Sequence, residues 1–489
     1  MKKSIIYIFF VLLMAAGLNS CYDEFLEPIP ETFISDLVAF DTKERIENQM
    51  NGIYASFKSG QYLGGRYQVY NDIRGDDWLN LQNNGVTGLL TWNHTLAPST
   101  SEVQNLWGAI YAAVNRVNMF LDGLEENQST ILGDNVLTQA EYDNFRGQAL
   151  ALRGIAYHHL IQLYAQPFNR DPQNWGAILR ITAQRSSADN DMPRSTLEET
   201  YAQILSDLNA AEGLLPDVSG SNNAGFVTRV HKSTVIAFKT RVYLHMNQWS
   251  NVITEANKIV SASAPFTAPA GVQYSLHSDF EEIFTNYTTS ESIFSMPMLP
   301  TELPGTQNGL GHYFSAATVG NNEYSINQNS VLWTSNAFPE TDARKNLVVE
   351  TSVGGTPHLF INKYQVFPHT DWAPVMRYAE VILNLAEAEA RQNGVTDRAV
   401  ALLNAVYLRS NPGADPLGGF ANADAFVARV MLERNLEFLG EGIRNMDTMR
   451  KVVAHGAKAG VAAVSPASPD YVWPIPLTEQ NTNQLVQPN

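Results

Sequence analysis

Apolar residues recur at helical spacing in paired segments along most of the chain, and this pattern limits the fold more than any other feature. The predicted helices span 41–57 and 101–124, 145–164 and 197–215, 232–246 and 249–260, and 377–392 and 397–408, with a further helix over 423–439. Ser195-Thr196-Leu197-Glu198 reads as a capping box at the start of one of them. Amphipathic helix pairs joined by short turns predict a mainly α fold of tetratricopeptide type, forming a right-handed superhelical scaffold.

Two long segments interrupt these pairs. Residues 60–100 are rich in Gly, Asn and aromatic residues, and residues 261–375 are dense in Asn, Thr, Ser, Gly, Pro, Tyr and Phe. Long insertions in a compact domain usually carry function. We therefore predict one domain over 31–489. Its helical scaffold is 31–260 and 376–489, and the insertions form a loop-rich subdomain with short strands.

The N-terminus is typical of a bacterial lipoprotein. Lys2 and Lys3 precede an apolar run over 5–16, which suits a signal peptide of residues 1–20 and is too short to span a bilayer. Leu18-Asn19-Ser20-Cys21 reads as a lipobox, and Cys21 is the only cysteine. We expect Cys21 to carry lipid (palmitate among its acyl chains) and 21–30 to form a tether. The alternative is an ordinary secretory signal with a stray cysteine.

Charge and composition exclude some classes of partner. The formal net charge is −17 and no block of Lys or Arg occurs, which argues against nucleic acid binding and against a polybasic membrane patch. Aromatic residues make up 10% of the chain, a composition compatible with neutral, hydroxyl-rich ligands. Most of these rings are nevertheless expected to fill the core.

The sequence gives little support for catalysis, a cofactor or a metal. It contains no nucleophile elbow, HExxH helix, P-loop, EF-hand loop or GxGxxG fingerprint. Asp76-Asp77 could serve glycoside hydrolysis, but a hydrogen-bonded loop turn is the favoured interpretation. His158-His159 should point to different helix faces and pack. We expect no enzyme.

A charged group near the C-terminus allows two interpretations. It comprises Glu433, Arg434, Glu437, Glu441, Arg444 and Asp447, with Arg377 as a further possible cation. Two carboxylates four residues apart on a helix repel each other unless nearby cations neutralise them. The functional interpretation is a catalytic acid pair, and the favoured one is a partly buried ion-pair network that fixes the C-terminal helices.

Several segments, in order, resemble the SusD/RagB family of outer-membrane lipoproteins. They are the lipobox region 21–26, the RGIAYHHLIQLY segment 153–164, the segment 229–244, the expected strand Glu291-Ser292-Ile293-Phe294, RYAEVILNLAEA over 377–388, the segment 433–450, and WPIP over 473–476. Residues 164–168 depart from the family's usual YG-x-VP.

The resemblance implies a protein anchored on the extracellular side of the cell outer membrane, where it caps a SusC-like TonB-dependent transporter. It would bind glycans, or alternatively peptides, for uptake, and would not be an enzyme. A lipoprotein glycosidase and a pure protein-interaction scaffold are the less favoured classes.

Glycan binding needs flat aromatic rings beside amide, carboxylate and guanidinium groups. The insertions offer such residues, and we predict that they form the ligand platform: Arg74, Asp76, Asp77, Trp78, Trp92, Asn93, Tyr313, Tyr324 and Trp333. Any single loop tryptophan could instead pack the insertion. Trp107 and Trp249 lie on predicted helices and should belong to the core.

Overall fold

The computed structural model describes residues 38–489, so the signal peptide, Cys21 and the tether lie outside the described residues. The helices are α2 (Lys43–Phe57), α3 (Arg66–Ile73), α4 (Leu89–Asn93), α5 (Ser101–Glu126), α6 (Gln128–Gly133), α7 (Gln139–Tyr164), α8 (Leu197–Leu214), α9 (Ala224–Val227), α10 (Lys232–His245), α11 (Trp249–Ala256), α12 (Leu310–Phe314), α13 (Val331–Thr334), α14 (Tyr378–Asn393), α15 (Asp397–Ser410), α16 (Ala423–Glu437), α17 (Arg444–Arg450) and α18 (Leu477–Thr482). The prediction of a mainly α fold is confirmed.

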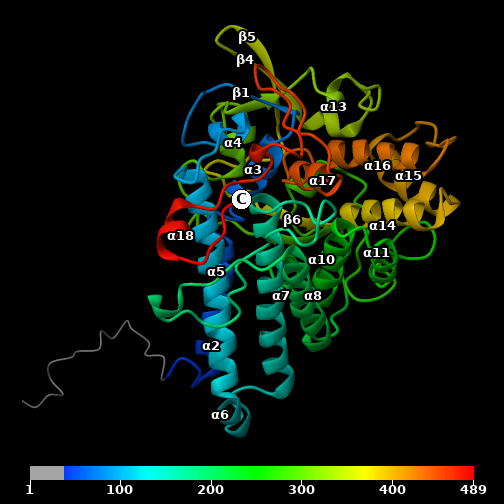
Figure 1. The fold of residues 1–489 in the computed structure, drawn as a ribbon. Helices are drawn as coiled ribbons and strands as arrows, with labels where there is room; N and C mark the ends of the chain where they lie inside the picture. The colour runs from blue at the N-terminus through cyan, green and yellow to red at the C-terminus, as the bar shows by residue number, and fades with distance from the viewer. Residues whose placement is uncertain (1–37) are drawn as a thin grey trace, which may run out of the picture.

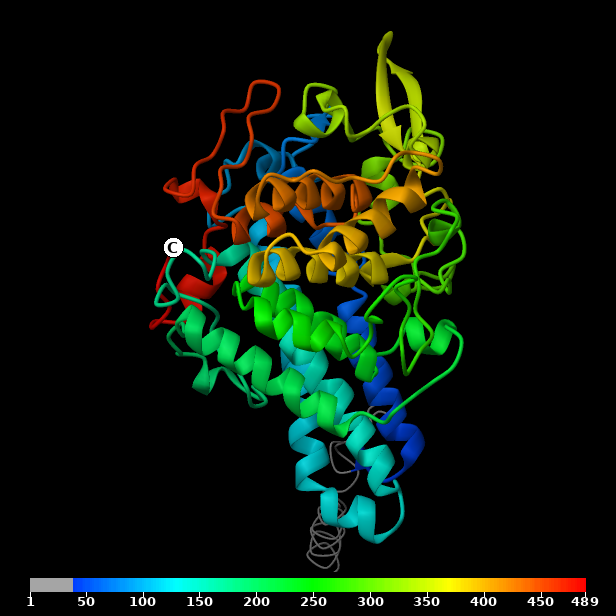
Figure 2. The same cartoon turned by 90° about the vertical axis from the view of Figure 1, so that its right-hand side faces the viewer.

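Successive helix pairs pack on one another as layers. Helix α7 packs on α8, α8 on α10, α10 on α11, α11 on α14, and α14 on both α15 and α16. Figure 2 shows this succession from α7 and α8 to α15 and α16, while α2, α5 and α7 run along the long axis in Figure 1. We call this set the helix stack. The right-handed tetratricopeptide superhelix stays a prediction.

The predicted helices are present with ends shifted by a few residues, and one cap is shifted by one. The observed cap of α8 is Thr196: its Oγ1 accepts from Glu199 N at 3.1 Å, and Glu199 Oε2 accepts from Thr196 N at 2.8 Å. The prediction of Ser195 and Glu198 is therefore wrong by one residue. The sequence allows both registers because Ser–Thr is followed by Glu–Glu at the same spacing.

The segment 60–100 is more ordered than its pattern indicates. It contains α3, α4 and strand β1 (Trp78–Asn80). All eight residues of α3 are buried, polar ones included, so the helix has no exposed face and shows no amphipathic period. The prediction of an irregular insertion is wrong here for that reason.

The segment 261–375 carries the predicted short strands. They are β2 (Ser292–Met296), β3 (Tyr324–Ile326), β4 (Val348–Val353), β5 (Thr356–Ile361) and β6 (Ala373–Arg377). They form three antiparallel pairs, β1–β3, β2–β6 and β4–β5. The β1–β3 pair joins the two predicted insertions, with Trp78 opposite Ile326, and the β4–β5 hairpin projects at the top of Figure 1. The expected strand at Ile293 and Phe294 is thus confirmed as part of β2.

A buried ionic cluster, which we call the ionic joint, ties the loop-rich segment to the C-terminal helices. Its cations are Arg344, Lys363, Arg377 and Arg409, and its carboxylates are Glu291, Asp342, Glu433, Glu437 and Glu441. Arg377 contacts Glu291 and lies 2.9 Å from Glu437 and 2.7 Å from Glu441. A structural ion-pair network is confirmed, but its cations differ from those predicted. Arg434 pairs with Asp447, and Arg444 pairs with Asp76 and Asp77, so Arg377 is the predicted cation that meets Glu437. Figure 1 shows α15, α16 and α17 beside the segment that it holds.

Candidate functional site

Three of the predicted platform rings lie in the interior. Trp78, Tyr313 and Tyr324 each have 0% exposed surface. The Trp78 ring packs on Phe314 at 4.5 Å between centroids, and Tyr313 stacks with Tyr324 at 6.3 Å. The prediction that these rings are exposed to ligand is wrong, because strand pairing between β1 and β3 brings the two insertions together and buries them.

Trp92 and Arg74 are also buried, and each forms hydrogen bonds that link two segments of the chain. Trp92 Nε1 donates to the Trp78 carbonyl at 2.8 Å, which fixes α4 against β1. Arg74 donates to Asn445 Oδ1 at 3.0 Å and to the Tyr471 carbonyl at 2.7 Å. Burial lowers the pKa of Arg74 to about 10. Both were predicted to face ligand, and the structure instead places them behind the surface.

The pair Asp76 and Asp77 is held by one guanidinium. Arg444 Nη2 lies 2.7 Å from Asp76 Oδ1, and Arg444 Nε lies 3.1 Å from Asp77 Oδ2. Asp77 is buried and also accepts from Asn435 Nδ2 at 3.0 Å, and burial raises its pKa. The hydrogen-bonded loop turn is confirmed. Asp76 and Arg444 remain partly exposed, so their outer edges can meet a ligand.

Trp333 is the predicted ring that reaches the surface. It lies half-buried in α13, next to Val331, which is 64% exposed. The Lys345 ammonium lies 4.9 Å from its ring centroid, and Phe338 meets it edge-on at 5.6 Å. These contacts fix the indole while leaving part of it accessible to solvent.

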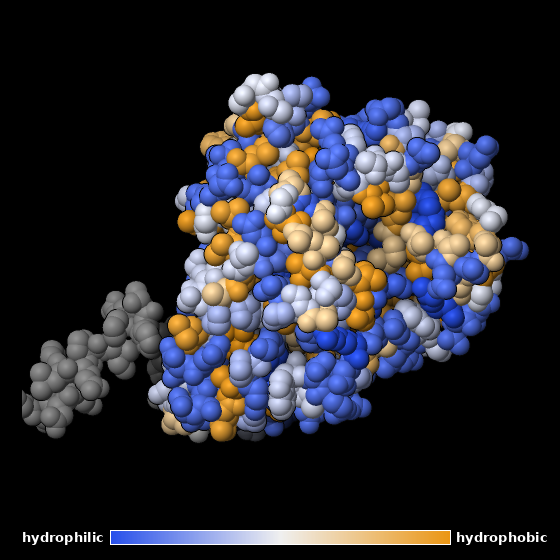
Figure 3. Space-filling view, turned by 45° about the horizontal axis from the view of Figure 1, so that its top comes forward, coloured by the Kyte–Doolittle hydropathy of each residue, from blue (hydrophilic) through white to orange (hydrophobic). Residues whose placement is uncertain are grey.

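The loop before α13 connects this ring to the Asp76 turn. Asn327 Nδ2 donates to the Asp76 carbonyl at 2.7 Å, and α13 packs on α16, which carries Asn435. We call the partly exposed group Asp76, Trp333, Asn435 and Arg444 the Trp333 surface. On the face seen in Figure 3, hydrophobic and hydrophilic residues are interspersed. Asn93, the remaining predicted residue, is half-buried at the end of α4.

The Trp333 surface offers recognition chemistry. An indole face can stack on the C–H face of a sugar ring, and carboxylate, amide and guanidinium groups can pair with hydroxyls. Within residues 38–489, no three His, Cys, Asp or Glu side chains gather as metal ligands would.

The adjacent histidines of α7 belong to the interior. His159 Nδ1 lies 2.8 Å from the Tyr62 hydroxyl, and His158 Nε2 lies 3.3 Å from His245 Nδ1. Both rings are fully buried, and burial lowers the pKa of His158 to about 3. The packing role predicted for this pair is confirmed. Trp107 is buried as predicted, while Trp249 is half-buried against the helix stack.

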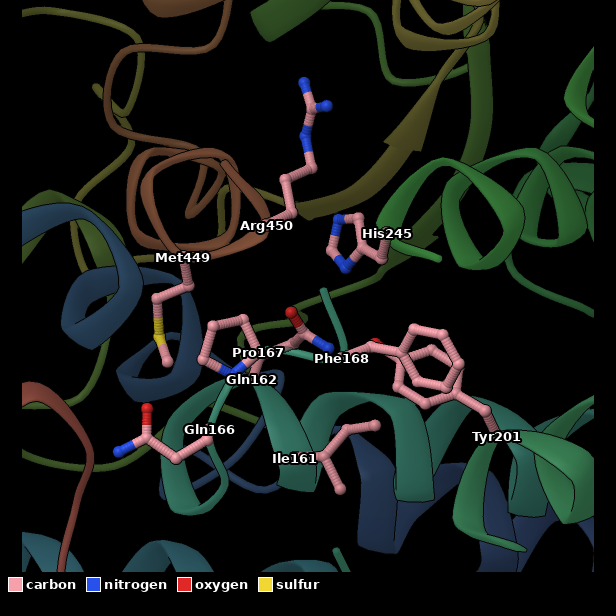
Figure 4. Close-up of a pocket in the computed structure, with 9 residues that line it drawn as sticks. All are labelled: Ile161, Gln162, Gln166, Pro167, Phe168, Tyr201, His245, Met449 and Arg450. Atoms are coloured by element: carbon pink, nitrogen blue, oxygen red, sulfur yellow. The ribbon is translucent and has the colours of Figure 1, made fainter. Parts of the chain in front are cut away.

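A small cavity beside His245 is too small for a sugar. Figure 4 shows His245 on one side and Ile161 and Gln162 on the other, with Tyr201 and Phe168 together at one end, while the Arg450 side chain extends away from them. Its volume of ≈ 10 Å³ is about that needed for one water molecule. It is a packing defect with polar walls and holds no ligand-sized space.

Two family profiles match the sequence. Residues 24–244 match a family described as starch-binding and associating with the outer membrane, and residues 361–489 match the SusD family. Among curated proteins, SusD-like protein P38 of Formosa agariphila is 23% identical over 543 residues, which cover 98% of this chain and 99% of that protein.

Solved structures agree with the sequence matches. The crystal structure of a SusD superfamily protein from Bacteroides fragilis superposes with a TM-score of 0.80 at 31% identity, covering 92% of this chain and 99% of that one. A laminarin-binding SusD-like protein superposes with a TM-score of 0.68 at 20% identity, covering 92% and 99% of the two chains. On the strength of this identity, coverage and shared fold, the chain belongs to the SusD/RagB family.

Proposed function

We propose that this protein is a lipoprotein on the extracellular side of the outer membrane that binds a glycan and delivers it to a SusC-like TonB-dependent transporter. The observation that carries the proposal is the 31% identity to a SusD superfamily protein over 92% of the chain. The matched profile described as starch-binding, and the similar fold of a laminarin-binding protein, support a glycan as the ligand. The protein would act by binding and not by catalysis.

Membrane attachment would depend on lipid at Cys21. No helix in the described part of the chain is long and apolar enough to cross a bilayer. The lipobox supplies the alternative, since two or more acyl chains hold a protein stably on a membrane. Mass spectrometry of the membrane-extracted protein tests this: we expect a diacyl or triacyl adduct on Cys21, which Cys21→Ser would abolish.

The Trp333 surface is the proposed contact area for the glycan. Stacking on an indole contributes about 0.5–1.5 kcal/mol beyond burial, so one ring and a few hydroxyl contacts make a weak site. A weak site suits a protein that releases its ligand to a transporter. Trp78, Tyr313 and Tyr324 would act from behind, by supporting the loops that carry Trp333 and Asp76.

Titration calorimetry on the soluble form starting at Tyr22 tests the proposal against polysaccharides, oligosaccharides and peptide digests. We expect saturable heat with one glycan class and about fivefold weaker binding for Trp333→Ala, with Trp333→Phe close to wild type. Heat with peptides alone would replace the glycan by a peptide. Turnover of a chromogenic glycoside would contradict a purely binding role.

A further inference from the structure

A groove on the surface is formed by the loop after α7 and the C-terminal segment, and it shares no residue with the Trp333 surface. Its volume is about 650 Å³, within the range of small-molecule sites. The side chains that matter for binding are Gln166, Arg170, Asp171, Asn174, Trp175 and Asn489. The C-terminal segment and the loop after α7 can be followed in Figure 1.

Trp175 is unusual among the tryptophans of this protein. All eight lie within residues 38–489, and Trp175, at 43%, is the single one that is exposed; the other seven are buried or half-buried. A large exposed ring leaves apolar surface in water, so its presence at the edge of a concave site calls for an explanation. Among the described residues the ring has no aromatic partner, and 43% of the Trp175 surface is open to solvent.

The backbone that presents this ring is clamped. Gly176 N donates to the Ser195 carbonyl at 2.7 Å, and Leu197 N donates to the Asn174 carbonyl at 2.8 Å. The buried Arg194 donates from Nη2 to the Trp175 carbonyl at 3.0 Å. Because both sides of residue 175 are fixed in this way, its backbone loses little conformational entropy when a ligand stacks on the indole.

The groove lining is polar. Its charged side chains are Arg170 and Asp171, which have opposite signs. Arg170 Nη1 donates to Gln166 Oε1 at 2.9 Å, while the Asn174 side-chain amide makes no hydrogen bond within the described chain. A polar lining with an amide that has no partner suits a hydroxyl-bearing ligand, to which it can both donate and accept hydrogen bonds.

An exposed indole on a fixed backbone, beside polar side chains, points to sugar. We propose that this groove is a second glycan-binding site, in which Trp175 stacks on a neutral sugar ring while Asn174, Gln166 and Asp171 pair with its hydroxyls. This inference rests on the proposed glycan-binding function. Two sites on one molecule would raise the avidity for a long chain without strengthening either site.

The test compares Trp175→Ala, Trp175→Phe and Trp333→Ala with wild type by calorimetry. The probes are laminarihexaose, maltohexaose, cellohexaose and the corresponding polysaccharides. For a probe that binds, we expect Trp175→Ala to lower the affinity about fivefold or, for a hexasaccharide that fills each site separately, to halve the stoichiometry. Trp175→Phe should retain most of the wild-type affinity. Because Trp175 is exposed, its replacement should leave the melting temperature unchanged.

A second measurement removes any dependence on folding of the variants. The Trp175 indole N–H signal, assigned by its absence from Trp175→Phe, should shift when the binding hexasaccharide is added to wild type. A glycan that binds wild type while leaving this signal and the Trp175→Ala affinity unchanged overturns the second site and leaves the proposed function standing. Failure of every glycan to bind wild type overturns both.

Discussion

The helix stack and the ionic joint differ in the balance of the interactions that hold them together. In the stack, apolar side chains such as Leu160 and Leu383 are almost completely buried between helices, and a few buried ion pairs, such as Arg241–Glu380 between α10 and α14, add to them. At the joint, four cations and five carboxylates are buried with one another between the loop-rich segment and the C-terminal helices. Apolar contact is non-directional, whereas a buried ion pair stabilises only when its geometry is satisfied.

This difference bears on function. The loops that carry Trp333 emerge from a segment with few and short strands, so helix packing alone does not set their position. The joint holds that segment by Arg344 and Lys363 on the loop side and Glu437 and Glu441 on the helix side. We infer that the joint fixes the position of the loops. Four variants compare how much its contacts and those elsewhere in the molecule contribute to stability.

Arg377→Met should have the largest effect. It leaves Glu437 and Glu441 with fewer cations in the interior, and we expect the free energy of unfolding to fall by about 3–5 kcal/mol. Urea denaturation measures the loss, and hydrogen exchange should show it first over 340–375. Lys58→Met is the matched control: it breaks a pair with the exposed Glu302 and should cost less than about 1 kcal/mol. Equal losses of stability in Arg377→Met and Lys58→Met would refute the distinction between the buried joint and an exposed ion pair.

Leu160→Ala probes the helix stack. Leu160 is 1% exposed in α7, and its truncation should cost about 2–5 kcal/mol through lost burial and a residual cavity. Arg146→Ala, an exposed position of the same helix, serves as control and should change stability by less than about 0.5 kcal/mol. Hydrogen exchange should rise through α7 and α8. A loss confined to the loop-rich segment would contradict the separation of the two parts.

Asp72→Asn tests a buried carboxylate that forms no ion pair with the described residues. Asp72 Oδ1 accepts from Gly442 N at 3.1 Å, and burial raises its pKa from 3.8 to about 7. The wild-type protein is thus fully stabilised by neutral Asp72 below pH about 4 and loses that contribution as the pH rises through 7. We expect the variant to be more stable by about 4 kcal/mol at pH 8 and close to wild type at pH 4. If the variant and the wild type differed in stability by the same amount at pH 4 and at pH 8, Asp72 would not titrate between these pH values.

Thr196→Ala should have the smallest effect, a loss of about 1 kcal/mol from the N-cap of α8. Ser195→Ala is its control, because the sequence allows either residue as the cap while the structure shows Thr196. Thermal denaturation of both variants decides between the registers. A larger loss for Ser195→Ala would favour the register predicted from the sequence.

Prediction from the sequence succeeded where a residue pattern is compatible with a single structural outcome. Apolar spacing located the helices of the stack, and carboxylates such as Glu433 and Glu437 on one helix face indicated that cations must meet them. It failed at α3, whose eight buried residues leave no period to detect. It also passed over Trp175, since the segment 165–196 has no period and a single tryptophan carries no signal of exposure.

The amino-acid sequence by itself determined the mainly α fold, the family and the existence of a buried charge network, because these depend on local periodicity and on residues that recur in order. Only the tertiary structure decided which aromatic rings are available to a ligand. Trp78 and Trp175 both lie in segments whose sequence shows no helical period, yet pairing of β1 with β3 buries the first, and a loop held by hydrogen bonds leaves the second at the surface. Exposure depends on which distant segments meet, and short-range sequence patterns do not encode that.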